Sequence, residues 1–107
     1  MDVDLKLASV VTGIDFILGG HTHDGVPIPV TVKNSGGKTV VTNAGSNGKF
    51  VGVLDLNLVD GKLSGYEYRL LHVLSNFIKA DSELTTLINE IRKPNLVTLN
   101  EELAVTE

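Results

Sequence analysis

The chain has 107 residues, no cysteine and a formal net charge of −4 at pH 7. The missing cysteines exclude disulfides and thiolate metal sites, and the absence of a basic cluster argues against nucleic acid or an anionic membrane as a partner. Hydrophobic residues make up 42% of the sequence and aromatic residues only 5%, so we expect a small domain with an aliphatic core. No run approaches the roughly 20 apolar residues of a membrane span.

Residues 1–12 are predicted to form a helix that ends at Gly13, because apolar side chains recur at helical spacing and glycine commonly follows a helix. Acidic residues in the first turn suit the positive end of the helix dipole. We expect the apolar face to pack on the core. Its members are Val3, Leu7, Val10 and Val11.

A short apolar strand is predicted at residues 14–18, directly after this helix. Nothing polar alternates with the side chains of residues 16–18, so we expect this part of the strand to be buried on both faces. Gly19 and Gly20 end the strand and allow backbone or a ligand to come close. A strand buried on both faces needs neighbours on both sides, and no second parallel strand precedes it. This predicts an α/β fragment cut from a larger sheet.

His21 and His23 follow the two glycines, at the edge where open α/β sheets bind ligands. Two imidazoles suit a borderline metal such as zinc or manganese. They cannot complete a site alone, because a catalytic zinc takes about three protein ligands and manganese about six donors. The alternative is that both are loop histidines with satisfied hydrogen bonds. Asp24 either orients an imidazole by a hydrogen bond or is simply a turn residue.

The middle of the chain predicts two β-hairpins. The first joins strands at residues 30–33 and 39–42 through the turn at 34–37, after an extended loop at 25–29. The second joins residues 50–59 to 62–73 through an Asp-Gly turn, which is a strong hairpin signal. The segment between the hairpins, residues 43–48, is by composition an ordinary polar turn.

Three side chains of the returning strand, Tyr66, Tyr68 and Leu70, share one face. The third histidine, His72, stands between two apolar residues near the end of this strand. We expect it to be a buried or edge histidine with a backbone partner rather than a metal ligand.

Residues 75–80 predict a linker to a helix that is capped by Asp81 and stopped or kinked by Pro94. A second helical segment is predicted around Leu96, Leu99 and Leu103. Nothing in this region suggests chemistry, so its apolar stripe predicts core or interdomain packing. The stripe of the main helix consists of Leu84, Leu87, Ile88 and Ile91.

Several stretches resemble one enzyme family. Residues 19–24, GGHTHD, follow an apolar strand and are similar to the last metal-binding motif, G-H-[ST]-H, of the calcineurin-like metallophosphoesterases in the 5'-nucleotidase branch. Three further stretches resemble the SoxB family of thiosulfohydrolases, and the likeness runs along essentially the whole chain. They are VTNAGSNGKFVGVLDL, YRLLHVLSN and LAVTE.

The resemblance implies a fold and a domain organisation. Residues 1–75 would be the C-terminal part of a metallophosphoesterase-type αββα sandwich, and residues 76–107 a connector toward a further domain. The chain is expected to begin just after an S-H-N-G motif that supplies another metal-binding histidine. The remaining expected ligands, a D-x-H pair, a bridging aspartate and an asparagine, are not present in this sequence.

The resemblance also implies a function. His21 and His23 would bind different ions of a manganese pair, with zinc possible, and the activated water would release sulfate from a cysteine S-thiosulfonate on the SoxYZ carrier protein in the periplasm. Asn43 and Asn47 would donate to sulfonate oxygens in the pocket. The alternatives are a 5'-nucleotidase-like phosphomonoester hydrolase and a non-catalytic interaction module. We expect the isolated chain to be inactive.

Overall fold

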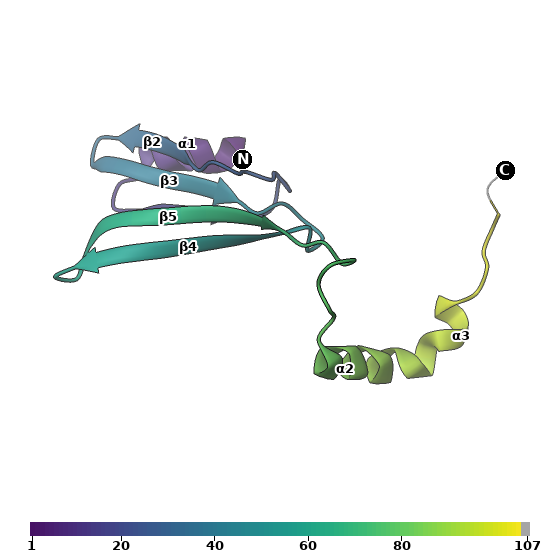
Figure 1. Ribbon diagram of the computed structural model, residues 1–107. Coiled ribbons are helices and arrows are strands. Elements are labelled where there is room, and N and C mark those ends of the chain that lie inside the picture. The colour runs from purple at the N-terminus through teal and green to yellow at the C-terminus, as the bar shows by residue number, and fades with distance from the viewer. Residues whose placement is uncertain (106–107) are drawn as a thin grey trace. The chain divides into compact units, whose positions relative to one another are not determined.

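The computed structural model describes residues 1–105, which divide into two compact units, Met1–Leu74 and a second unit that begins at Ser75. In chain order the elements are α1 (Asp2–Val10), β1 (Phe16–Gly19), β2 (Val30–Asn34), β3 (Gly37–Asn43), β4 (Phe50–Val59), β5 (Lys62–His72), α2 (Ser82–Arg92), the 3₁₀ turn η1 (Lys93–Asn95) and α3 (Leu96–Leu99). The first unit holds α1 and the strands β1 to β5, as Figure 1 shows. The α/β class predicted from the sequence is confirmed.

The first sheet has the strand order β1-β3-β2. The hairpin of β2 and β3 is antiparallel and turns at Ser35 and Gly36, as predicted, while β1 pairs with the other edge of β3 in parallel. The parallel partner of β1 is therefore found downstream, in a strand that the sequence predicted only as part of a hairpin. This arrangement brings the carboxyl ends of β1 and β3 to the same edge of the sheet.

The helix α1 is tied to the hairpin turn by Asn34. Its side-chain amide donates to the carbonyl oxygens of Ala8 and Val11, each at 3.0 Å, and its Oδ1 accepts from the backbone N–H of Gly36 at 3.0 Å. Glycine is needed at position 36 because a Cβ there would lie 2.7 Å from the Cβ of Thr12. The position of α1 against the hairpin turn is thus held by hydrogen bonds as well as by packing.

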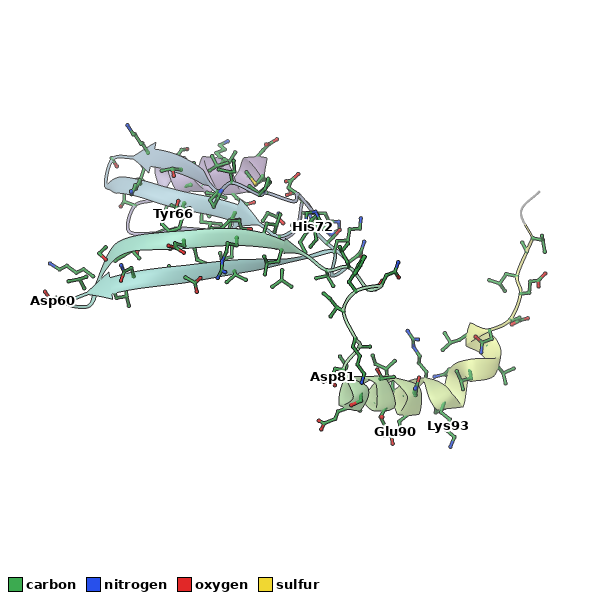
Figure 2. The ribbon with its side chains drawn as sticks, viewed as in Figure 1. Asp60, Tyr66, His72, Asp81, Glu90 and Lys93 are labelled. Atoms are coloured by element: carbon green, nitrogen blue, oxygen red, sulfur yellow. The ribbon has the colours of Figure 1, made fainter. Side chains whose placement is uncertain are left out.

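The second sheet is the hairpin of β4 and β5, paired from Phe50↔His72 to Val59↔Lys62 with an irregularity between Asn57 and Leu58. Its turn residues Asp60 and Gly61 both have positive φ, at 51° and 72°, as a type I′ turn requires. Figure 2 labels Asp60 at this turn.

The two sheets of the first unit meet through aromatic side chains. The ring of Tyr66 on β5 contacts the ring of Phe16 on β1 edge to face, with centroids 5.1 Å apart. Tyr66, Tyr68 and Leu70 are partly buried, while Glu67, Arg69 and Leu71 between and after them are exposed, which agrees with the face predicted for them. The fully buried apolar core of the described residues is small and consists of Ala8, Val40 and Val41.

The second unit contains α2, η1 and α3. Asp81 caps α2 as predicted, because its Oδ1 accepts from the backbone N–H of Leu84 at 2.8 Å. Pro94 lies in the 3₁₀ turn that follows α2, and α3 ends at Leu99, so the prediction that the second helical segment includes Leu103 is wrong. The stripe of α2 is exposed within the described residues. No helix of residues 1–105 is long and apolar enough to cross a membrane.

Several predictions about the first unit are wrong in detail. The first helix ends at Val10, three residues before Gly13, and the face it buries contains Ala8, while Val3 is 78% exposed. The first strand runs from Phe16 to Gly19 and is not buried on both faces, since Leu18 is 70% exposed. β1 is also an edge strand of the described sheet, with β3 on one side and no strand on the other, so the neighbours expected on both sides are not present among the described residues.

The predicted domains have both a boundary and a role. The described chain divides after Leu74. That residues 1–75 belong to a catalytic domain and residues 76–107 to a connector stays a prediction.

Candidate metal centre

The two histidines predicted to bind metal lie in a turn directly after β1. The backbone N–H of His23 donates to the carbonyl oxygen of Gly20 at 3.2 Å, which closes a four-residue turn around His21 and Thr22. His23 has φ of 60°. A non-glycine residue in this left-handed region is uncommon and costs about 1 kcal/mol or more, so the surrounding contacts must hold it there.

Those contacts come from the end of β3. The backbone N–H of Val26 donates to the carbonyl oxygen of Asn43 at 2.9 Å, and the N–H of Gly45 donates to the carbonyl oxygen of Asp24 at 2.8 Å. Gly25 and Ala44 form an antiparallel bridge between these two bonds. Residues 24–26 therefore pair with residues 43–45 through backbone hydrogen bonds, as two short antiparallel strands do.

A polar network fills the inside of the turn. The hydroxyl of Thr22 donates to the carboxylate of Asp24 and accepts from the side-chain amide of Asn43 at 3.3 Å. The hydrogen bond from Thr22 lowers the pKa of Asp24, so its carboxylate is ionised at neutral pH.

Asn43 is a central part of this network. It is 1% exposed, and besides its bond to Thr22 its Oδ1 accepts from the backbone N–H of Gly45 at 3.1 Å. Asn47, the other predicted pocket residue, is exposed in the next turn with φ of 57°. The structure thus gives the two asparagines different surroundings, one inside the loop and one on its surface.

The imidazoles of His21 and His23 are exposed side chains. Within residues 1–105 no hydrogen bond or ion pair involves either ring, and no three His, Asp, Glu or Cys side chains are grouped closely enough to hold a metal ion. Free imidazole nitrogens fit the donor chemistry of manganese or zinc, and the two rings could each supply one ligand. Completing either coordination shell requires further donors.

Two other predicted residues have their positions settled. Asp24 has the Thr22 hydroxyl as its hydrogen-bond partner, so its role toward an imidazole stays a prediction. His72 lies at the end of β5 (Figure 2), is exposed rather than buried, and packs its ring against Phe50 with centroids 4.8 Å apart. Sequence reasoning missed Thr22, although a hydroxyl residue between two histidines was the available signal.

Comparison with known proteins finds similar structures over almost the whole chain. The structure of SoxB, a sulfate thiohydrolase of Thermus thermophilus in complex with glycerol, is 33% identical and covers 98% of this chain with a TM-score of 0.83. The structure of a 5'-nucleotidase precursor, also from Thermus thermophilus, is 26% identical and covers 96% with a TM-score of 0.80. This chain spans only 19% and 23% of those two proteins.

A curated sequence gives a shorter match. The trifunctional nucleotide phosphoesterase YfkN of Bacillus subtilis (strain 168) is 45% identical over 53 residues, which are 50% of this chain and 4% of that protein. No protein-family model matches the chain. The resemblance predicted from the sequence is confirmed: the chain is similar in sequence and structure to a segment of the SoxB and 5'-nucleotidase structures, both of the metallophosphoesterase superfamily.

Proposed function

We propose that this chain is part of a two-metal hydrolase in which His21 and His23 each bind one divalent ion. The observation that carries the proposal is the turn at residues 20–24. Its two unengaged imidazoles stand at the carboxyl edge of β1, and bonds to the end of β3 hold the residues that follow them. Ligands of open α/β sheets bind at this edge. The similarity to SoxB and 5'-nucleotidase over nearly all of the chain supports the same conclusion.

The residues of the chain have separate tasks in this proposal. A bound pair of divalent ions lowers the pKa of water and stabilises charge that develops on the oxygens of the substrate. The neutral imidazoles of His21 and His23 supply one nitrogen ligand each, and the remaining ligands come from polypeptide outside these residues. Thr22, Asp24 and Asn43 hold the turn in shape, so that the rings need little reorganisation when an ion binds.

The proposed substrate is a cysteine S-thiosulfonate on the SoxYZ carrier protein, from which water releases sulfate. The proposed ions are manganese, with zinc as the second choice, and the proposed location is the periplasm. The support is the 33% identity to a sulfate thiohydrolase, together with the stretches around Asn43 and Asn47 that resemble that family. Asn47, which is exposed in the turn, is the better placed of the two asparagines to reach a substrate oxygen.

Hydrolysis of nucleotide phosphomonoesters is the second candidate function. Two observations favour it: the 45% identity to a nucleotide phosphoesterase over 53 residues and the TM-score of 0.80 to a 5'-nucleotidase precursor. Both substrates present a tetrahedral anionic centre to the same kind of metal pair, so the turn itself does not distinguish them.

The test uses the full-length protein that carries this chain, loaded with manganese. Sulfate release from thiosulfonate-loaded carrier and phosphate release from 5'-nucleotides are measured side by side, with metal content determined on the same samples. We expect close to two ions per protein and faster turnover of the carrier. Faster turnover of nucleotides selects the second candidate, and a protein that binds no metal refutes both.

A further inference from the structure

The aromatic ring of Phe50 packs against the segments that hold the histidine turn in place. Phe50, the first residue of β4, lies against Gly25 and Gly45, where a Cβ would stand 3.3 Å and 3.0 Å from its ring carbons. On another side the ring meets the imidazole of His72 edge to face, with centroids 4.8 Å apart. The ring therefore lies close to both glycines, and a side chain at either position would meet it in a tight contact.

The two glycines take part in the backbone pairing that holds the turn against the end of β3. Gly25 directly follows Asp24 and pairs with Ala44, and Gly45 donates the hydrogen bond to the Asp24 carbonyl oxygen. The Phe50 ring lies against the two backbones that this bridge joins. It is thus in a position to fix the strained conformation of His23, two residues upstream of Gly25.

We propose that Phe50 is a positioning residue for the metal-binding turn, acting through Gly25 and Gly45 on the backbone of His23. This inference rests on the proposed function, since it assumes that His23 binds a metal ion. Partners that orient a ligand from behind commonly account for about 10- to 100-fold in metal affinity. Removing the Phe50 ring should therefore loosen the turn and weaken metal binding, although the ring itself touches no ion.

The chain provides a matched control. Phe16 on β1 also makes an edge-to-face contact, with Tyr66 at a centroid distance of 5.1 Å, and it lies at the start of the strand rather than at the end that carries the turn. Phe16→Leu removes one aromatic pair between the two sheets, and Phe50→Leu removes one aromatic pair within the β4-β5 sheet. Any loss that comes only from a missing aromatic contact should appear in both variants.

The experiment measures manganese affinity of the full-length protein by equilibrium dialysis, together with hydrogen exchange of the peptide covering residues 20–27 in the metal-free state. We expect Phe50→Leu to raise the dissociation constant about tenfold and to speed exchange in that peptide. Phe16→Leu should leave both close to those of the wild type. Equal losses in the two variants, or no loss in Phe50→Leu, would overturn the inference. A wild type without metal binding would instead refute the proposed function and the inference with it.

A second variant keeps the test decisive if Phe50→Leu does not fold. Gly25→Ala places a methyl group 3.3 Å from the Phe50 ring, which also contacts Gly45 and His72, so the ring and the turn must shift by a few tenths of an ångström to accept it. We expect Gly25→Ala to weaken manganese binding and Gly25→Ala/Phe50→Leu to recover part of that loss, because the smaller side chain makes room for the methyl group. Independent, additive losses would overturn the inference.

Discussion

Replacing Asn43 with alanine tests whether the loop is held by side-chain bonds or whether this asparagine serves the substrate. The change removes two hydrogen bonds, one to the Thr22 hydroxyl at 3.3 Å and one from the Gly45 N–H at 3.1 Å. Each such bond contributes about 1 kcal/mol net, and both donor and acceptor partners keep a second bond. We therefore expect the free energy of unfolding to fall by about 2 kcal/mol.

The measurement is urea denaturation of the full-length protein in the presence of a chelator, so that bound metal does not add to the apparent stability. Metal affinity and the steady-state constants are determined on the same variant. Because the lost bonds shape the turn rather than touch substrate, we expect weaker metal binding, and once metal is saturating, an unchanged KM.

The matched control is Asn47→Gly. Asn47 is exposed and already has a positive φ, which glycine adopts without strain, so the change in stability should stay within about 0.5 kcal/mol. If Asn47 donates to the substrate, this variant raises KM with metal affinity unchanged. The reasoning fails if Asn43→Ala leaves stability and metal affinity intact while KM rises. Asn43 would then be a substrate donor, as the resemblance alone implies.

Three further predictions address other parts of the chain. In the metal-loaded full-length protein, His21→Ala or His23→Ala should abolish metal occupancy and nearly all turnover, whereas His72→Ala should be mild; comparable damage from His72→Ala would contradict the assignment of the two ligands. Asp81→Ala removes the cap of α2 and should cost that helix about 1 kcal/mol, seen as faster hydrogen exchange in its first turn; unchanged exchange would show that the cap contributes nothing. The isolated 107-residue chain should neither hydrolyse substrate nor unfold sharply, because few of its apolar side chains are buried; a sharp melt or measurable turnover would contradict this.

Local sequence signals predicted the hairpins and the cap of α2 well. The Asp60-Gly61 turn, the polar turn of the first hairpin and Asp81 before α2 each contain the residue types that these conformations require. Such features depend on side chains and backbone within a few residues of one another, so a short stretch of sequence contains the needed information.

Burial and long-range pairing were predicted less well. Periodicity marked Val3 and its neighbours as the packing face of α1, yet Ala8 is the buried residue, and β1 pairs with a strand about 20 residues away rather than lying between two neighbours. Apolar spacing shows that a face is suited to burial but does not say which element covers it. The packing of α1 is set instead by Asn34, whose bonds to the end of the helix no periodicity contains.

The candidate site combines both kinds of information. The two histidines were found from their spacing after a strand and two glycines, because metal binding depends on residue type. The conformation of their turn depends on Asn43 and Phe50, which lie about 20 and 30 residues further along the chain and belong to other strands. A motif of six residues thus names the ligands, but the backbone strain at His23 is held by residues outside the motif. Variants of those supporting residues, rather than of the histidines alone, therefore test whether the turn is built to bind metal.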